Sequence, residues 1–356
     1  MHTLCQQMTN PANKTMKNVR PIEKIKVILF LLALTISVTV FCSCGYKQIE
    51  SAEEEAAVVG KVGGYDVKYE ELRYITVLHK KQMALTYGAD IWTSAESAEK
   101  YRSELENAVY SAIKQDYAVR ALAAEVGYKI TDPDVVAQTT EYVSEFVKEI
   151  GGMGKYRKYL KESCMTDSFF RMSMATDILE SQLKYTYTEI GYITTDYSEI
   201  YDAIMSKDMF LRTVHIFISD DKEGRNANEA EAIANAAYAE LENGADFSDV
   251  MKKYNEDSEQ DADTGMYFTY GEADEAYEST ARELSFDKYS KVIHTGGGYI
   301  IIKRERPDVQ YVMMNMASLA ERYQYSVLQT FIDDKKSNMK FEPNELGSGI
   351  DLTKID

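Results

Sequence analysis

The chain contains few histidines, so each one is a candidate for catalysis or ligand binding until its environment is known. The 356 residues hold only four histidines, at positions 2, 79, 215 and 294. His215 lies in the stretch FLRTVHIFISDD, residues 210–221, within an apolar run that is typical of a strand. An imidazole there is either a catalytic or ligand-binding group or a polar residue tolerated inside a strand. Its neighbourhood in the fold must decide between the two.

Other chemistry-bearing patterns are weak. The histidines are scattered and no pair of cysteines has metal-ligand spacing, so we expect no metal site and no cofactor. The glycines at 296–298 lack a following helix, which favours a hairpin turn over a phosphate loop. A Ser-His-Asp arrangement stays open, but no nucleophile-elbow motif supports it. We interpret His79 as a helix-surface residue.

The overall charge excludes one class of partner. Lys and Arg number 40 against 58 Asp and Glu, a net charge of −18. That excess of acid argues against electrostatic capture of nucleic acid. A length of 356 residues allows two or more domains, and the 45% hydrophobic composition is enough to build cores.

The N-terminal segment has the pattern of a targeting signal. Basic residues precede the apolar run VILFLLALTISVTVF, residues 27–41, and CSCGYK follows it. A run of that length is short for a bilayer span, which takes about 20 helical residues. The cysteine after it resembles a bacterial lipoprotein cleavage box. We therefore expect a signal peptide at 1–43 and lipidation of Cys44, with an uncleaved membrane anchor as the alternative.

Maturation at Cys44 would leave Cys164 as the only free thiol, which we interpret as a buried packing residue. Residues 44–58 are polar and acidic and are expected to form a tether. From 59 to 209, a short strand, the Gly63-Gly64 turn and a second strand precede a series of amphipathic helices. We expect Met313, Met314 and Met316 to pack within a helix, with an adaptable apolar face as the alternative.

The pattern changes over residues 210–306. It predicts a strand carrying His215, an Ala-rich helix, a short helix, a long polar loop over 258–274, another helix, and a closing strand–turn–strand unit. Two β segments flanking helices describe a small α+β domain. A long helix then starts after Pro307, and the tail 340–356 is expected to be irregular. The overall fold class is therefore α+β.

The order of motifs in this block is more specific than any single residue. TVHIFIS, NGADFSDVMKKYNED, YESTAREL and HTGGGYIIIK follow one another in the order found in the parvulin family of peptidyl-prolyl isomerases, which the block resembles. The resemblance implies an antiparallel sheet with surrounding helices, inserted in a mainly α-helical chaperone domain. VVGKVGGYDVKYEELRYI likewise resembles the opening of PrsA-type and SurA-type foldases. It implies a helical N-terminal chaperone domain over 59–209, with a C-terminal helix in 307–356 completing it.

The resemblance also implies a site, carried over residue by residue. His215, Asp257 and Thr295 match the catalytic histidine, the Cys/Asp and the Thr of the family network. The substrate-binding positions fall on Phe268, Ala273, Tyr277, Leu284 and Ile300. Two of these depart from the pattern, because Ile300 stands where the second histidine belongs and Ala273 where a ring-gripping Met belongs. Arg282 replaces an aromatic residue, and His294 is not expected to substitute for the missing histidine.

These departures predict an incomplete active site in which His215 lacks a polar partner. The first functional hypothesis is a membrane-anchored, extracytoplasmic isomerase that acts on X–Pro bonds of newly secreted polypeptides, with weakened activity. The second is an inactive parvulin-fold holdase that binds unfolded polypeptides, or a scaffold lipoprotein for one partner. We expect no nucleic acid as a partner, and a homodimer stays open.

Overall fold

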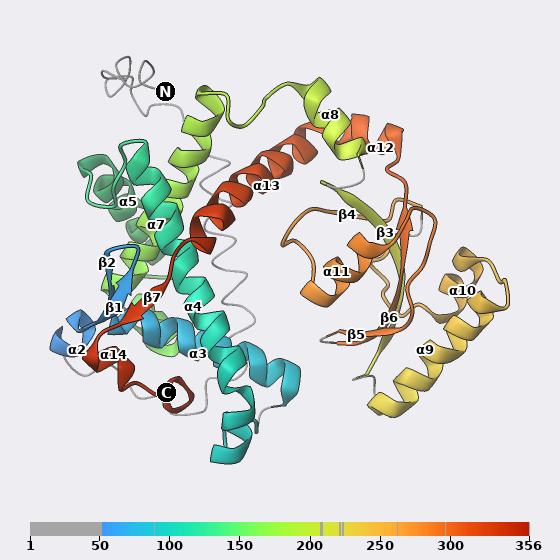
Figure 1. The fold of residues 1–356 in the computed structure, drawn as a ribbon, viewed down its shortest axis with the longest axis horizontal. Helices are drawn as coiled ribbons and strands as arrows, with labels where there is room; N and C mark the ends of the chain where they lie inside the picture. Colours follow the sequence, from blue (N-terminus) through green and yellow to red (C-terminus); the bar gives the residue numbers. More distant parts are fainter. Residues whose placement is uncertain are drawn as a thin grey trace.

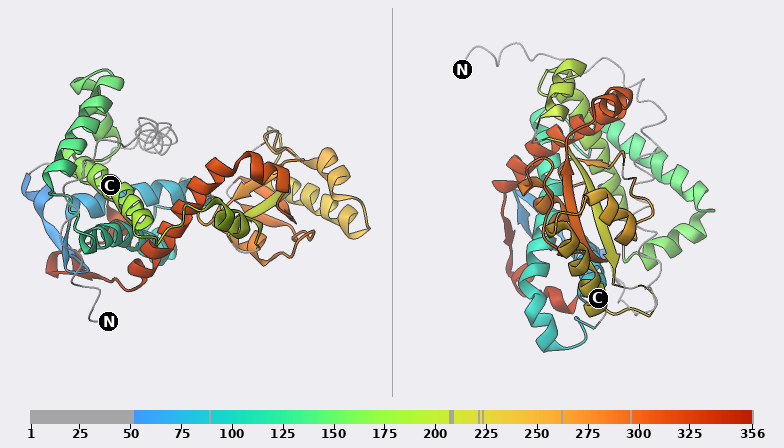
Figure 2. Two further views of the ribbon diagram at one scale, coloured as in Figure 1. Left: turned by 90° about the horizontal axis from the view of Figure 1, so that it is seen from above. Right: turned by 90° about the vertical axis from the view of Figure 1, so that its right-hand side faces the viewer.

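The chain forms two units that lie end to end (Figures 1 and 2). The computed structural model describes residues 52–88, 90–206, 209–220, 222, 224–261, 263–295 and 297–355. The expected signal peptide, Cys44 and the first part of the expected tether lie outside these described residues. We call residues 52–206 with 316–355 the helical unit, and residues 209–305 the sheet unit.

The helical unit combines long helices with one small sheet. The sheet has the antiparallel order β2-β1-β7, from β1 (Val58–Val62), β2 (Tyr65–Lys68) and β7 (Phe341–Pro343). The helices are α2 (Ala52–Ala56), α3 (Tyr69–Tyr87), α4 (Ala95–Glu125), α5 (Pro133–Glu149), α6 (Met153–Glu162), α7 (Asp167–Glu189), α8 (Tyr197–Met205), α13 (Met316–Ser337) and α14 (Glu345–Ser348), with a 3-10 turn at Leu352–Lys354.

Residues from both ends of the chain share one core in this unit. Val59 and Leu72 near the start pack in the same buried cluster as Leu328, Ile332 and Leu352 near the end. The α13 helix runs from the sheet unit back into the helical unit, where β7 continues it (Figure 1). This arrangement confirms the predicted insertion of a small α+β domain into a mainly helical one.

The sheet unit has an antiparallel four-stranded sheet of order β4-β3-β6-β5. Its strands are β3 (Leu211–Ser219), β4 (Met266–Phe268), β5 (Ile293–Thr295) and β6 (Gly298–Glu305). Its helices are α9 (Ala227–Glu242), α10 (Phe247–Tyr254) and α11 (Glu275–Glu283). Each helix begins after an N-cap, since Asn226, Asp246 and Asp274 accept hydrogen bonds from backbone N–H groups.

Helices cover the sheet on both faces (Figure 1). Val214, Ile216 and Ile218 of β3 pack with α9 and α10 in one core. Side chains alternate along a strand, so Leu211 lies on the opposite face. There it packs in a second cluster with Tyr277 and Ala281 of α11. The predicted glycine hairpin joins β5 to β6, and a Cβ at Gly298 (φ +150°) would lie 2.1 Å from the carbonyl oxygen of Ile218. Only glycine fits there.

Four predictions for single segments are wrong. The polar loop over 258–274 contains β4, whose three residues pair with Leu211–Thr213. The long C-terminal helix divides into α12 (Val309–Met314) and α13, because Asn315 caps the end of α12 with its side-chain amide donating to Tyr311 O at 2.9 Å. The tail expected to be irregular forms β7, α14 and the 3-10 turn. Met313 and Met314 are exposed (66% and 77%) rather than packed.

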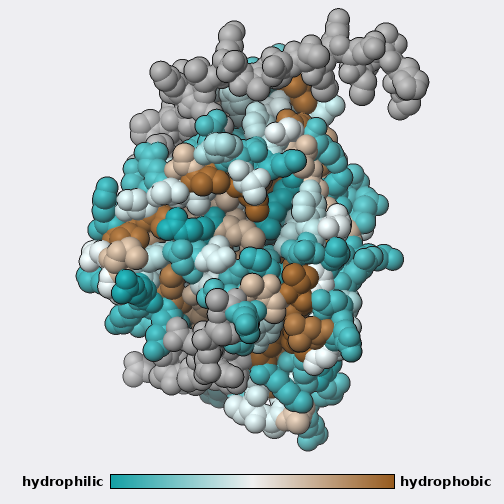
Figure 3. Space-filling view, turned by 90° about the vertical axis from the view of Figure 1, so that its left-hand side faces the viewer, coloured by the Kyte–Doolittle hydropathy of each residue, from teal (hydrophilic) through white to brown (hydrophobic). Residues whose placement is uncertain are grey.

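Other single-residue predictions fare differently. Cys164 is buried, as predicted. Residues 52–56 of the expected tether form α2. Among the described residues, no helix has both the length and the apolar character to cross a bilayer. On the face of the helical unit drawn in Figure 3, hydrophobic residues gather in several separate patches between hydrophilic ones.

Candidate active site

His215 lies on β3, near the middle of the sheet, and its ring is almost inaccessible. It pairs with Ile302 of β6 and is only 8% exposed. Thr213 and Phe217 lie on the same face of the strand, two residues to either side. This face meets α11, so the imidazole points into the layer between the sheet and that helix.

His215 is hydrogen-bonded through both ring nitrogens. Its Nε2 lies 3.1 Å from Oδ2 of Asp257, and its Nδ1 lies 3.2 Å from Oη of Tyr277. The Tyr277 hydroxyl is in turn 2.8 Å from Oγ1 of Thr213. We call this line of side chains, Thr213–Tyr277–His215–Asp257, the polar row. The prediction that His215 lacks a polar partner is therefore wrong, because a helix residue supplies one in place of the missing strand histidine.

Burial sets the charge states in the polar row. It lowers the pKa of His215, an effect that the nearby carboxylate of Asp257 opposes. Burial likewise raises the pKa of Tyr277 above the usual value of a phenol. Near neutral pH the imidazole is therefore neutral and the phenol keeps its proton.

The segment after α10 positions Asp257 against the edge of β3. Since β4 covers only Leu211–Thr213, the rest of that edge is bound by residues 255–257. Phe217 N donates to Oδ1 of Asn255 at 2.9 Å, and Glu256 N donates to Phe217 O at 2.9 Å. Asn255 also donates to the carbonyl of Asp257 at 2.8 Å, which fixes the turn that carries the carboxylate.

Glu256 clamps the same segment from the other side. Its two carboxylate oxygens accept from Arg225 at 2.6 and 2.7 Å, and Lys222 lies 2.7 Å away. A third bond comes from Ser219 N at 3.0 Å. The Arg225 guanidinium is the main reason that the pKa of Glu256 falls to about 2. Such charge-assisted, two-point bonds hold geometry well.

The five expected substrate-binding residues gather in one apolar cluster on the α11 face: Phe268, Ala273, Tyr277, Leu284 and Ile300. Phe268, Tyr277 and Ile300 are 1%, 5% and 5% exposed. Accessible apolar surface therefore comes from the half-buried Ala273 and Leu284 and from the neighbouring Phe217, Met266 and Ile293. A proline ring approaching His215 would meet these side chains first.

Thr295, the third expected catalytic residue, is set apart from the polar row. It pairs with Gly298, which pairs with Ser219 of β3, four residues along the strand from His215. At about 3.3 Å per residue this is on the order of 13 Å. Its hydroxyl donates to Gly298 O at 3.4 Å. Within the described part of the chain, no recorded contact links Thr295 to His215.

His294 and Arg282 have other partners. Since it precedes Thr295 on β5, His294 faces the opposite side of the sheet, where its Nε2 lies 3.2 Å from Oδ2 of Asp220. As expected, it does not replace the missing histidine. The guanidinium of Arg282 lies 3.5 Å from the Tyr270 ring centre and forms an ion pair with Glu278 at 2.8 Å.

One member of the polar row was missed from the sequence, and another was given a different role. Thr213 could have been found, because a residue two positions before His215 in a strand shares its face. Tyr277 was assigned only an apolar contact, since its hydroxyl is an addition to the aromatic residue expected there. Whether that hydroxyl would turn toward His215 depends on the position of α11, which strand and helix periodicity do not fix.

A second hollow in the described part of the chain has a lining of different chemistry. A cavity of about 720 Å³ lies in the helical unit between the β1–β2 turn, α4 and α13, but its lining carries no histidine or cysteine: Gly63, Tyr65, Ala121, Ala124, Glu125, Asp334, Lys335, Asn338 and Met339. Among the residues that the structure describes, no group of three or more His, Cys, Asp and Glu could hold a metal ion.

Two protein families match the two units. Residues 215–306 match the family described as the PPIC-type PPIASE domain. Residues 16–184 match the SurA-like N-terminal domain. The first match covers all of the polar row except Thr213, and the second covers most of the helices before α8.

Similar proteins carry the name of a foldase. The chain is 24% identical over 285 residues to Foldase protein PrsA of Caldanaerobacter subterraneus, covering 79% of this chain and 82% of that protein. It is 24% identical over 197 residues to Foldase protein PrsA of Staphylococcus aureus, covering 53% of this chain and 57% of that protein.

Solved structures of similar proteins include PrsA from Bacillus cereus and from Bacillus subtilis. The first is 17% identical, with 79% of this chain and 90% of that chain covered and a TM-score of 0.28. The second is 17% identical, with 80% and 93% covered and a TM-score of 0.26.

Proposed function

Because the chain combines a PPIC-type peptidyl-prolyl isomerase domain with a SurA-like N-terminal domain, we propose that it is an extracytoplasmic foldase with prolyl isomerase activity. Its substrates are unfolded or newly secreted polypeptides that contain X–Pro bonds. The observation that carries the proposal is the polar row, in which a neutral His215 lies between Asp257 and Tyr277. The name of the relatives, foldase, agrees with it.

The reaction requires no covalent chemistry. Rotation about an X–Pro bond meets a barrier of about 20 kcal/mol and takes tens of seconds unaided. A catalyst lowers that barrier by holding the proline ring against apolar side chains and favouring the twisted amide over the planar one. In this chain Asp257 and His215 supply the polar side of the site. Ala273, Leu284 and their half-buried neighbours supply the apolar side.

We propose further that the activity is weak. Ala273 offers a smaller apolar contact than a methionine would, a difference of roughly 1–3 kcal/mol in binding. Phe268, Tyr277 and Ile300 are too buried to grip a ring without movement of α11. Thr295 is remote from His215, so its position does not support the catalytic role expected for it. We therefore assign the hydrogen bonding to the substrate to the polar row.

The test is to measure cis–trans exchange by NMR exchange spectroscopy on a panel of X–Pro peptides that differ in X. We expect the purified chain to accelerate cis–trans exchange above the uncatalysed rate for at least one X. Background rates for every X would refute isomerase activity.

A holdase without isomerase activity is the second candidate, and one observation favours it. Val309, Met313 and Met314 of α12 are 50%, 66% and 77% exposed. Flexible methionines suit contacts with varied apolar segments. Suppressed aggregation of an unfolded client, lost in the Met313→Ser, Met314→Ser double variant, would support this function. Unchanged suppression in that variant would remove α12 from it.

We also propose that the chain is held at the outer face of the bacterial membrane by a lipid on Cys44. The basic lead and the apolar run 27–41 support a lipoprotein signal. Labelled fatty acid should be incorporated by cells that express the chain and not by cells that express Cys44→Ala. Labelling of both would place the lipid elsewhere, and labelling of neither would support the uncleaved anchor.

A further inference from the structure

The Tyr277 hydroxyl occupies a position that decides how protons are arranged along the polar row. It bridges Thr213 at 2.8 Å and Nδ1 of His215 at 3.2 Å. Its ring stands nearly perpendicular to the imidazole, at 84°, and the ring centres are 5.7 Å apart. The contact between the two rings is therefore carried by the hydrogen bond at Nδ1 and not by stacking of the ring faces.

The direction of each hydrogen bond follows from the Asp257 end. The Oδ1 of Asp257 accepts from Glu259 N at 2.9 Å, which leaves Oδ2 for His215. An ionised carboxylate only accepts, so Nε2 of His215 carries the proton and donates. A neutral imidazole then has a lone pair on Nδ1, which must accept from Tyr277. The Tyr277 oxygen in turn accepts from the Thr213 hydroxyl, so every group is used once.

The two ends of the row differ in access. Thr213 and Tyr277 are 0% and 5% exposed, whereas the Asp257 side chain is 33% exposed. A peptide therefore meets the row from the Asp257 end, and the hydroxyl groups lie behind His215. They act through the histidine and not on the substrate.

We infer that Tyr277, supported by Thr213, is a positioning residue that acts together with Asp257 to hold His215 as its Nε2–H tautomer, with Nδ1 accepting from the Tyr277 hydroxyl. This hydroxyl pair replaces the second histidine, whose strand position is held by Ile300. The inference rests on the proposed isomerase function. The hydrogen-bond pattern can nevertheless be measured without activity. Burial lowers the pKa of His215, which agrees with the neutral ring that this pattern requires.

The test is ¹H–¹⁵N NMR of the histidine rings in the full chain, which distinguishes the two neutral tautomers and the charged form. Signals are assigned with His215→Gln and His294→Gln. We expect His215 to be the Nε2–H tautomer in the unmodified chain and in Thr213→Val, where Tyr277 still donates. In Tyr277→Phe Asp257 still favours Nε2–H, but the Nδ1 lone pair loses its donor, so we expect a shifted ¹⁵N signal of Nδ1 and a raised pKa for His215. Tyr289→Phe is the matched control, because it removes a hydroxyl bonded to the exposed Glu242 in the same unit.

The same variants give an activity readout. Tyr277→Phe should lower kcat/KM for X–Pro exchange by about 10-fold, as expected for a lost hydrogen bond, and Tyr289→Phe should not. An Nδ1–H tautomer in the unmodified chain, or an unchanged Nδ1 signal and pKa of His215 in a folded Tyr277→Phe, would overturn the inference. Background exchange in the unmodified chain together with the expected tautomers would refute the isomerase function while leaving the positioning of His215 established.

Discussion

At the residue scale, the site consists of one buried imidazole with partners from two different elements. Asp257 comes from the segment after α10 and Tyr277 from α11. Each partner satisfies one ring nitrogen, so a histidine that is 8% exposed carries no unsatisfied polar atom. Being buried and neutral, His215 also links protonation to stability.

His215 should make the free energy of unfolding depend on pH. Its pKa is lowered in the folded state, so between that value and about 6.5 the unfolded chain binds more protons. Its contribution is therefore complete above about pH 6.5 and is lost as the pH falls through the folded pKa. Urea unfolding at several pH values between 5 and 8 should show this slope, and His215→Gln should reduce it. An equal slope in His215→Gln, with exposed His294→Gln as control, would contradict the account.

Restoring the family histidine should not restore the site. Ile300 is 5% exposed in an apolar cluster, and Tyr277 already occupies Nδ1 of His215. Ile300→His would bury an imidazole without a partner, so it should destabilise the chain by about 1–3 kcal/mol. Denaturant unfolding measures this, with Ile300→Val as the conservative control. Higher exchange activity without loss of stability would show that the histidine finds a partner there.

Much of the site could be predicted from sequence, but not its bonding. His215 and Asp257 were found through motif order, and the structure brings them within 3.1 Å. The Tyr277 hydroxyl was not found, because its direction depends on how α11 packs on the sheet. Thr295 shows the opposite limit, since matching a motif position gave no information on its distance from His215.

At the element scale, the incomplete coverage of β3 explains how Asp257 is placed. The short β4 leaves Phe217 N and Ser219 N without strand partners, and side chains of Asn255 and Glu256 accept from them instead. The Asp257 carboxylate thus lies on a segment that is bound to the sheet edge by side chains. The clamp on Glu256 should control that segment.

Glu256→Gln should loosen the edge of β3. It removes the charge that holds Arg225, so we expect a loss of about 1–3 kcal/mol in local stability. We expect faster amide hydrogen exchange at Phe217 and Ser219. Mass spectrometry of peptides from β3 measures this exchange. Because the pKa of Glu256 is about 2, the protection it gives is complete above about pH 4.5 and is lost as the pH falls through about 2. Glu259→Gln, an exposed neighbour, is the control, and equal exchange in both variants would contradict the role of the clamp.

Elements with a local sequence signal were predictable, whereas β4 and β7 were not. The other strands and the helices of the sheet unit follow from apolar patterning and glycine turns. The three-residue β4 was missed because its hydrogen bonds come from β3, distant in sequence. The same reason applies to β7, which pairs with β1 at the other end of the chain.

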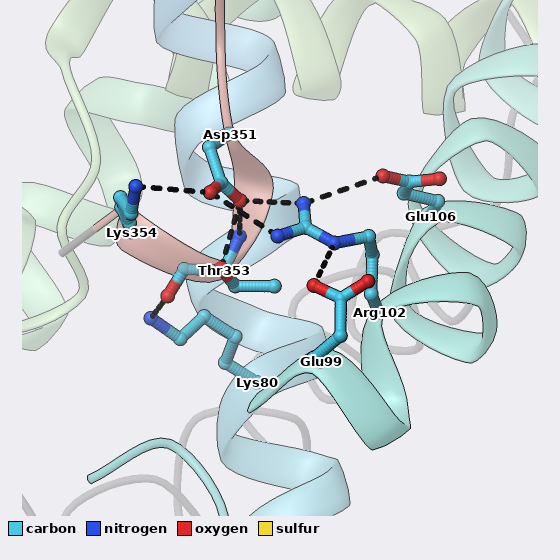
Figure 4. A network of polar contacts seen from close by, with 7 residues as sticks. All are labelled: Lys80, Glu99, Arg102, Glu106, Asp351, Thr353 and Lys354. Carbon is cyan, nitrogen blue, oxygen red and sulfur yellow. Dashed lines mark hydrogen bonds and ion pairs between the residues drawn. The ribbon is translucent and has the colours of Figure 1, made fainter. Parts of the chain in front are cut away.

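At the scale of the whole molecule, the C-terminal segment is bound to helices near the start of the chain (Figure 4). Lys80 of α3, only 4% exposed, donates to the carbonyls of Thr353 and Ile355 at 3.0 and 2.7 Å. Arg102 of α4 binds Asp351 through two bonds of 2.7 and 3.2 Å, and its guanidinium holds the pKa of that carboxyl well below its usual range. The C-terminal segment is thus fixed to α3 and α4, so the parts of the chain before and after the inserted sheet unit are joined in the helical unit.

Lys80→Met should weaken the attachment of the C-terminal segment to α3. It keeps the length of the side chain but leaves two carbonyl groups without their donor, so we expect a loss of about 1–3 kcal/mol in unfolding free energy. The chain has one tryptophan, Trp92, whose indole donates to Lys80 O, so its fluorescence reports this region directly. Lys354→Met is the control, because that side chain is 81% exposed, and it should change stability by less than about 0.5 kcal/mol. Equal effects of the two variants on the free energy of unfolding would contradict a stabilising role of the Lys80 hydrogen bonds.

The two units meet in a core built from three parts of the sequence. Ile200 and Ile204 of α8, Phe210 and Tyr267 beside the sheet, and Val312 of α12 pack together. This core fixes the sheet unit against the helical unit.

The most direct test of the central claim is the rate of cis–trans exchange of one responsive X–Pro peptide with the unmodified chain, His215→Gln and His294→Gln. The account predicts acceleration by the unmodified chain and by His294→Gln, and a rate near background for His215→Gln. Equal acceleration by all three would show that the polar row does not carry the activity.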